Sequence, residues 1–233
     1  MKTFYAGGSL GDAYVILCKV YRIAQEEPIL LKHYTENESL KSSILEIYSL
    51  VSGIGVEFRD DKKPFGITGQ FIHHKLAGKR MTYLPDDDGY GLELECHPDF
   101  NIRSEDRFDL PAHYVTMQLE SGANPKKLRH LGTQEIEKII NKSELPVVVL
   151  GKDNVDFTQS NGTIDLRGQT NIKEMVKIIR DGYHFYGCLG LLSLVALSQR
   201  VHSTLYKPLY LKDKHAFESR VQPVAEWKRY VTQ

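Results

Sequence analysis

The strongest constraint on the fold is an alternation of strand-like and helix-like segments that begins with the first residues. KTFYAG at 2–7 has the aromatic and β-branched content of a buried strand, and strand patterns recur at 28–35 and 54–60. Between these strands, apolar side chains repeat at helical spacing over 11–27 and 37–51. Strands that alternate with helices predict a parallel sheet with helical crossovers, so this part of the chain is expected to form an α/β domain.

A second alternating series starts at 113–121, after a middle segment with a less regular pattern. Helices are expected at 132–143, 171–182 and 190–200, and strands at 146–151, 183–187 and 201–208. The middle segment, 60–110, is rich in Gly, Pro and Asp, and its pattern favours a helix over 70–76 and a strand over 80–85.

The two series divide the chain into two α/β halves. The chain has 233 residues and 41% hydrophobic content, which is enough to bury a core in each half. We expect a Rossmann-like N-terminal domain at 1–110 and a Rossmann-like C-terminal domain at 111–233, with the boundary near Asp109 to His113. A helix over 216–231 is expected to close the second domain.

Composition excludes some classes of partner and site. The 30 Lys and Arg residues equal the 30 Asp and Glu residues, so no overall positive field exists to collect nucleic acid or an anionic membrane. The three cysteines, Cys18, Cys96 and Cys188, form no CxxC and no Cys/His spacing of the zinc type, so neither a metal site nor structural disulfides are expected.

The N-terminus has no secretory signal pattern, and the longest nearly uncharged run, 185–198, is too short to span a bilayer. We therefore expect a soluble cytoplasmic protein without a transmembrane segment.

A glycine-rich turn, GGSLGD, follows the first strand and contributes Gly8, Ser9, Gly11 and Asp12. Ligands of parallel sheets gather at the carboxyl ends of the strands, where glycines allow close backbone approach. The spacing matches neither GxGxxG nor the GK[ST] ending of a Walker loop. Two interpretations of Asp12 therefore stay open: it caps the first turn of a helix, or it is a functional group at a ligand site.

Two loops of the second half contain candidate ligand contacts. The segment QLESGANPKK places Ser121 close to Lys126 and Lys127, and a hydroxyl beside lysines suits a diphosphate. A solvated basic loop before a helix is the alternative. After the strand at 146–150, Asp153 could accept hydrogen bonds from a sugar hydroxyl, although loop acids are usually only solvated.

A basic cluster lies in the irregular middle segment. Its members are His73, His74, Lys75, Lys79 and Arg80. Adjacent histidines without a third ligand are weak evidence for a metal, and a solvent-facing basic helix end is the default interpretation. The alternative hypothesis is that the cluster contacts an anionic acceptor, including DNA.

The second half resembles the donor-binding domain of the lipopolysaccharide heptosyltransferases. That family has an x-x-D-L-x-G-x-T-x-[IL]-x-E segment, then a helix, a strand and a glycine-containing turn. The matching residues are Asp165, Leu166, Gly168, Thr170, Ile172, Glu174, Gly187 and Gly190. The first loop also looks like that of the family, in which an aspartate after a glycine is the proposed catalytic base. The resemblance covers nearly the whole chain in order and is weakest between 60 and 110.

The resemblance implies the GT-B fold, in which two Rossmann-like domains with parallel sheets face each other across a cleft. It also implies an inverting, metal-independent transfer of a hexosyl or heptosyl group from a nucleotide-diphosphate sugar, with no further cofactor. The acceptor hydroxyl would belong to a glycan, a lipid-linked molecule or a nucleic acid. By position, Asp12 would be the base, and the acceptor side would be formed by Gly8, Ser9, Gly11, His73, His74, Lys79 and Arg80. The donor contacts would be Ser121, Lys126, Lys127, Asp153, Gly187, Gly190 and Ser193.

The chain also departs from the family pattern. Members commonly have D-S-G-x-x-H at the turn after the next-to-last strand, where this chain has Cys188 in place of the acid and Ser193 in place of the histidine. The chain is also shorter than expected for such an enzyme. These departures leave two interpretations open: a trimmed viral or accessory transferase with altered donor contacts, or a catalytically silent nucleotide-sugar or glycan-binding protein of the same fold. A third hypothesis is another two-Rossmann enzyme such as a sugar-nucleotide epimerase, which would need further acids and histidines at its site.

Overall fold

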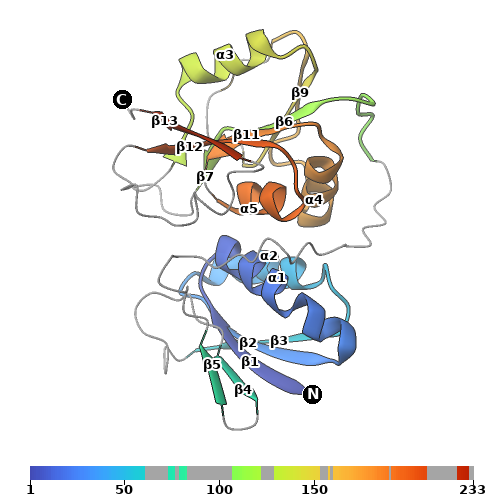
Figure 1. Ribbon diagram of the computed structural model, residues 1–233, viewed down its shortest axis with the longest axis vertical. Coiled ribbons are helices and arrows are strands. Elements are labelled where there is room, and N and C mark those ends of the chain that lie inside the picture. Colours follow the sequence, from blue (N-terminus) through green and yellow to red (C-terminus); the bar gives the residue numbers. More distant parts are fainter. Residues whose placement is uncertain are drawn as a thin grey trace. The chain divides into compact units, whose positions relative to one another are not determined.

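A computed structural model gives the fold, and the chain divides into two compact units, Met1–Ile102 and Arg103–Gln233 (Figure 1). The sequence placed the boundary slightly later, near Asp109 to His113. The structure describes residues 1–60, 73–76, 79–82, 107–121, 129–152, 157, 160–188, 190–208 and 225–230. Each unit is a sheet with packed helices.

The first unit begins with the β-α-β-α-β alternation that the sequence predicts and continues with a β-hairpin. Its elements are β1 (Lys2–Gly7), α1 (Leu10–Glu26), β2 (Ile29–Tyr34), the 3-10 turn η1 (Glu38–Leu40), α2 (Lys41–Tyr48), β3 (Ile54–Arg59), β4 (His73–Leu76) and β5 (Lys79–Thr82).

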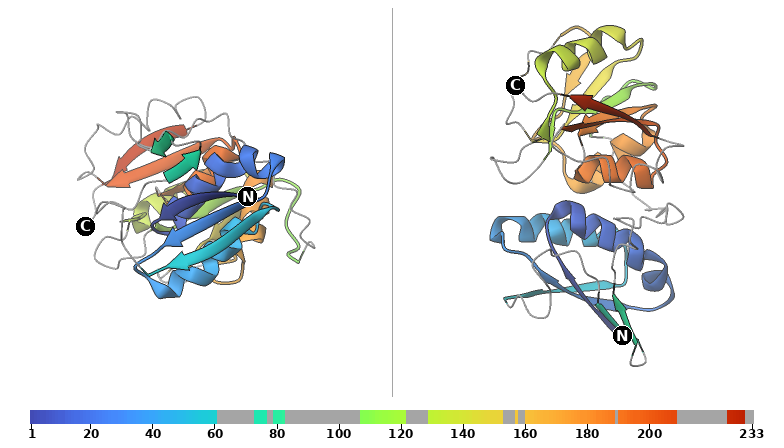
Figure 2. Two further views of the ribbon diagram at one scale, coloured as in Figure 1. Left: turned by 90° about the horizontal axis from the view of Figure 1, so that it is seen from below. Right: turned by 60° about the vertical axis from the view of Figure 1, so that its left-hand side comes forward.

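The sheet of the first unit has the order β3-β2-β1-β4-β5, with β1, β2 and β3 parallel and β4 antiparallel to β1. Both helices, α1 and α2, cover the same face (Figures 1 and 2), as right-handed crossovers running in one direction require. Alternate residues of β2 enter this core: Ile29, Leu31 and His33 are each 0% exposed. A histidine therefore occupies a core position at the carboxyl end of β2.

The expected helix over 70–76 is wrong in its described part. Residues His73–Leu76 form β4, which pairs with β1 through Phe4 and His74 and with β5 through Leu76 and Lys79. Edge pairing determines the conformation here, because β1 has a free edge that a helix would leave without hydrogen bonds. The expected strand over 80–85 is confirmed for its described residues, which belong to β5.

The second unit contains the other alternating series. Its elements are β6 (Val115–Gln118), β7 (Glu120–Ser121), β8 (Arg129–His130), α3 (Thr133–Lys142), β9 (Val147–Leu150), β10 (Thr163–Asp165), α4 (Ile172–Asp181), β11 (Phe185–Cys188), α5 (Leu191–Ser198), β12 (Ser203–Pro208) and β13 (Ala225–Tyr230).

The main sheet of the second unit is parallel throughout, with the order β10-β9-β6-β11-β12-β13. Numbered within the unit, this is the order 3-2-1-4-5-6 of a Rossmann fold. Crossovers run in opposite directions from the centre, so α3 covers one face and α4 and α5 cover the other (Figures 1 and 2). The order of the strands reverses between β6 and β11, which is the point where such sheets bind ligands.

The expected closing helix over 216–231 is wrong for residues Ala225–Tyr230, which form β13 and pair in parallel with β12. The sequence has a proline at 223, and proline is unfavourable inside a helix because it lacks the amide hydrogen and clashes with the preceding turn. The exposed edge of β12 then accepts the following segment as a sixth strand.

Within the part of the chain that the structure describes, no helix is long and apolar enough to cross a membrane.

Candidate functional site

The turn between β1 and α1 folds the Asp12 carboxylate back onto the backbone before the helix. The backbone amide of Ser9 donates to Asp12 Oδ2 at 2.8 Å, and the Ser9 hydroxyl donates to the same oxygen at 3.0 Å. Both donors therefore use Oδ2, and neither occupies Oδ1. Asp12 does make the capping contact that the first interpretation requires.

A capping role alone does not account for the ionisation of Asp12. A carboxylate that only caps a helix is stabilised by amide hydrogen bonds and by the helix dipole, and its pKa falls. Here burial raises the pKa of Asp12 above its usual range and outweighs the hydrogen bonds from Ser9, which act to lower it. A partly buried carboxylate with a raised pKa at a sheet edge is typical of a functional site.

Gly8 packs directly against this carboxylate. Its φ is +118°, and a Cβ atom at this position would lie 2.4 Å from Asp12 Oδ2. The Gly8 amide donates to the Tyr34 carbonyl oxygen at 2.9 Å, so the turn is held against the end of β2. A glycine is therefore needed here for both its conformation and its lack of a side chain.

The other residues expected on the acceptor side are only partly brought together. Ser9 and Gly11 share the turn with Asp12. His73 pairs with Tyr5, towards the carboxyl end of β1, whereas Lys79 pairs with Leu76 and lies with Arg80 towards the opposite end of that strand. Lys79 and Arg80 therefore lie towards the amino end of β1, whereas Asp12 follows its carboxyl end.

In the second unit, the expected donor residues Ser121 and Gly190 meet at the point where the strand order reverses. Ser121 follows β6 and is 6% exposed, and Gly190 precedes α5. A Cβ atom on Gly190 would lie 1.8 Å from Ser121 Oγ, so the hydroxyl packs directly on the glycine backbone. This contact places a serine hydroxyl beside the N-terminus of a helix at the carboxyl edge of a parallel sheet.

A residue that the sequence analysis did not single out, Gln118, lies at the same edge. It is the last residue of β6 and is 6% exposed, and its Oε1 has no hydrogen-bond partner within the described ranges. Its Cγ lies 4.0 Å from where a Cβ of Gly151 would be, and its Cβ lies 3.1 Å from that of Gly187. A buried amide oxygen without a partner costs free energy unless a ligand or water satisfies it.

The two residues that depart from the family pattern are both buried, and Ser193 has a structural role. Ser193 is 0% exposed; its hydroxyl accepts from the Gly190 amide at 2.8 Å and donates to the Gly190 carbonyl oxygen at 2.8 Å. Cys188 is a buried thiol at the end of β11. Ser193 therefore stabilises the turn before α5 rather than extending an imidazole from it.

The motif that carries the resemblance is also used structurally. Burial opposes the ionisation of Asp165, but hydrogen bonds from Arg167 outweigh it and hold its pKa below the usual range. Glu174 and Asn171 form a reciprocal capping box at the start of α4, with distances of 2.8 and 2.9 Å. Glu174 therefore stabilises the start of α4.

Three predicted donor residues, Lys126, Lys127 and Asp153, lie outside the residues that the structure describes. No group of three or more His, Cys, Asp or Glu side chains in the described ranges is arranged to hold a metal ion.

Two further buried residues near Asp12, His33 and Tyr48, were not foreseen from the sequence. His33 occupies a core position of β2, and Tyr48 ends α2. The only local signal for His33 was a polar residue at an apolar position of the strand pattern, PILLKHYT.

No protein-family model matches the sequence, and no curated protein matches it. Solved structures do match. The E. coli ADP-heptose lipopolysaccharide heptosyltransferase II is 12% identical, with a TM-score of 0.52, over 100% of this chain and 92% of that chain. A glycosyl transferase of family 9 from Veillonella parvula is 8% identical, with a TM-score of 0.53, over 99% of this chain and 86% of that chain.

A further similar structure is the dodecameric iron-containing heptosyltransferase TibC of enterotoxigenic E. coli, in complex with ADP-D-beta-D-heptose. It is 14% identical with a TM-score of 0.51 over 90% of this chain, and this chain spans 58% of its length. A second TibC structure is likewise spanned over 60% of its length. At identities this low, the structural similarity shows the fold alone, and it confirms the expected GT-B fold with two parallel sheets.

Proposed function

We propose that the chain is a glycosyltransferase that moves a sugar from a nucleotide-diphosphate sugar to an acceptor hydroxyl, with Asp12 as the general base. The observation that carries this proposal is the environment of Asp12 in a chain with a heptosyltransferase fold. Its carboxylate is partly buried and has a raised pKa at the carboxyl edge of the first sheet. A base is most effective when its pKa is raised towards the working pH, and this environment moves Asp12 in that direction.

The proposed transfer inverts the configuration at the anomeric carbon of the sugar. Asp12 takes the proton of the acceptor hydroxyl while the oxygen attacks C1 of the sugar, and the bond from C1 to the diphosphate oxygen breaks with its electron pair on the departing nucleoside diphosphate. An inverting transfer needs one such base. The proposed mechanism is independent of metal, because amides and basic side chains stabilise the charge on the leaving group.

The donor is proposed to bind at the carboxyl edge of the second sheet. Ser121, Gly187, Gly190 and the lysines at 126 and 127 are the proposed contacts, and the unpartnered amide oxygen of Gln118 adds an acceptor for a donor hydroxyl or amino group. ADP-heptose is a reasonable first donor to test, because TibC was solved with it.

Thermal-shift screening against nucleoside diphosphates and nucleotide sugars tests donor binding. A ligand at 100 times its dissociation constant adds about 2.7 kcal/mol to stability, which gives a measurable shift. Donor hydrolysis or transfer is then compared between the wild type and Asp12→Asn. Loss of about 10² to 10⁴ in rate is expected for the variant.

The screen also separates the alternatives. Binding of a nucleotide sugar without any turnover would favour the catalytically silent binding protein, and absence of any nucleotide shift would count against both hypotheses. Equal turnover by Asp12→Asn would remove the assigned base. Turnover in the presence of EDTA and the anomeric configuration of the product test metal independence and inversion.

A further inference from the structure

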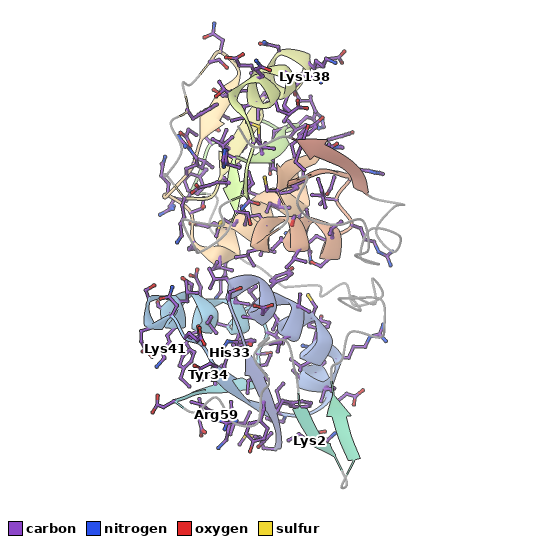
Figure 3. The ribbon with its side chains drawn as sticks, turned by 90° about the vertical axis from the view of Figure 1, so that its left-hand side faces the viewer. Lys2, His33, Tyr34, Lys41, Arg59 and Lys138 are labelled. Carbon is purple, nitrogen blue, oxygen red and sulfur yellow. The ribbon has the colours of Figure 1, made fainter. Side chains whose placement is uncertain are left out.

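A buried hydrogen-bonded pair lies beneath the turn that holds Asp12. His33 is 0% exposed and Tyr48 is 1% exposed. The distance between His33 Nδ1 and the Tyr48 hydroxyl is 2.8 Å, and the distance between His33 Nε2 and the Gly8 carbonyl oxygen is 3.3 Å. The pair thus joins the end of α2, through β2, to the backbone of the turn. Figure 3 labels His33 and its neighbour in β2, Tyr34.

The partners determine which nitrogen of His33 carries the proton. The Gly8 carbonyl oxygen can only accept, so His33 Nε2 must donate. In the neutral ring, Nδ1 is then an acceptor, and the Tyr48 hydroxyl must donate to it. A single arrangement of protons satisfies both bonds.

The pair is uncharged at neutral pH. Burial lowers the pKa of His33 to about 4, against a smaller opposite effect of the Gly8 carbonyl oxygen. Burial raises the pKa of Tyr48, and the charge of Asp12 raises it further. The rings of Tyr48 and Phe58 both make T-shaped contacts with the imidazole, so two aromatic side chains pack against it.

The pair acts on Asp12 through Gly8. Both polar backbone groups of Gly8 are held by the end of β2: the amide by the Tyr34 carbonyl oxygen and the carbonyl oxygen by His33. The Asp12 carboxylate packs directly on this residue. Movement of Gly8 would therefore move the carboxylate or admit water beneath it.

We propose that His33 and Tyr48 are positioning residues for Asp12, which fix Gly8 and keep the space beneath the carboxylate dry and uncharged. This inference rests on the proposed function for its catalytic meaning, because positioning matters for turnover only if Asp12 is the base. The alternative is that the pair only stabilises the core of the first unit.

The test uses the full chain with Tyr48→Phe, which keeps the ring and removes the hydroxyl, and with His33→Gln and His33→Leu. Gln can still donate to the Gly8 carbonyl oxygen, whereas Leu cannot. Tyr114→Phe is the matched control, because the buried Tyr114 hydroxyl in the second unit donates to the Ile178 carbonyl oxygen at 3.0 Å.

The decisive measurement is the titration of the Asp12 carboxyl carbon by 13C NMR, which needs no turnover. In Tyr48→Phe and His33→Leu, water beneath the carboxylate should lower the pKa of Asp12 towards its ordinary value of 3.8. His33→Gln should restore part of the wild-type value, and Tyr114→Phe should leave it unchanged. An Asp12 titration that is the same in Tyr48→Phe as in the control overturns the proposal.

Turnover of the identified donor is a second measurement. Misplacement of a base lowers the rate of the chemical step, so kcat should fall by about 10- to 100-fold in Tyr48→Phe with little change in KM. If the wild type turns over no donor, the proposed function fails, while the NMR titration still decides whether the pair positions Asp12.

Discussion

At the scale of single residues, the turn after β1 depends on Gly8. Its φ of +118° is in the region that L side chains rarely adopt, and the Asp12 carboxylate fills the space of a side chain. Gly55 in β3 differs, because a Cβ there would lie 3.4 Å from Leu30 Cδ1, an ordinary contact. The two glycines therefore give a matched pair of substitutions.

We predict that Gly8→Ala lowers the free energy of unfolding by about 2 kcal/mol or more, because backbone strain adds to a clash with Asp12. Gly55→Ala should change it by about 0.5 kcal/mol or less. Urea unfolding followed by circular dichroism measures both values. Similar stability of the two variants would show that the turn relaxes without cost.

The raised pKa of Asp12 predicts the acid limb of the activity profile. The base must be ionised, so kcat/KM falls as pH decreases through its pKa, and this limb should lie above the ordinary aspartate value of 3.8. Initial rates from pH 4 to 9 with a donor at low concentration measure it. A limb at or below the ordinary value would mean that Asp12 is solvated or is not the base.

His33 predicts a loss of stability in acid. Folding lowers its pKa from 6.5 to about 4, so between these values the unfolded chain binds the proton more strongly. The contribution of His33 is complete above about pH 6.5 and decreases by about 3 kcal/mol as pH falls to about 4.

Hydrogen exchange of the β2 amides measures this slope in the wild type and in His33→Gln, which should lack it. His202→Gln, which replaces an exposed histidine of the second unit, should keep the wild-type slope. An equal slope in the wild type and His33→Gln would assign the acid loss to other groups.

The sequence pointed to Asp12 because a glycine-rich turn after a first strand is a local pattern. It could not point to His33 or Tyr48 as its partners. Gly8 meets His33 only because β1 and β2 pair in parallel with Gly7 opposite Tyr34, and this register is a property of the folded sheet. Gln118 could not be predicted for the same reason. Its Oε1 is buried without a hydrogen-bond partner, within the described residues, only because the neighbouring strands surround it.

At the scale of elements, local periodicity predicted most helices and strands, whereas pairing of distant edges determined the exceptions. The strand at 2–7 and the helix at 132–143 are found within a residue of their expected bounds, as β1 and α3. β4 and β13 were wrongly expected as helices. Their own residues contain no signal for the free edges of β1 and β12, with which they pair. Such edges exist only after the sheet has formed.

The contact between β7 and the start of α5 gives a prediction at this scale. Gly190 has an extended φ of 174°, so Gly190→Ala is unfavourable only because its Cβ would overlap Ser121 Oγ at 1.8 Å. We predict that Gly190→Ala destabilises the chain by about 1 to 3 kcal/mol. Urea unfolding should show that Ser121→Gly combined with Gly190→Ala recovers most of this loss. Additive effects in the double variant would mean that the two residues do not meet.

At the scale of the whole molecule, the balanced charge and the two-unit architecture indicate that ligands are recognised by local sites and not by the overall field of the protein. Lys plus Arg and Asp plus Glu balance at 30 each, so no general attraction for anions supplements a binding site. The chain divides into two compact units, each with a parallel sheet segment whose carboxyl edge carries candidate residues. The proposed donor residues belong to the second unit and the proposed base to the first, so a donor nucleotide should act on one unit selectively.

Hydrogen exchange of the full chain tests this selectivity. With a nucleoside diphosphate bound, protection should increase in peptides that contain 115–121 and 185–193, because the carboxyl ends of β6 and β11 and the start of α5 surround the proposed phosphate site. Peptides from β1 and β2 should exchange as in the free protein. Asp12→Asn should keep the same protection, since its carboxylate acts on the acceptor. Protection confined to the first unit would place the nucleotide beside Asp12 and reverse the proposed roles of the two units.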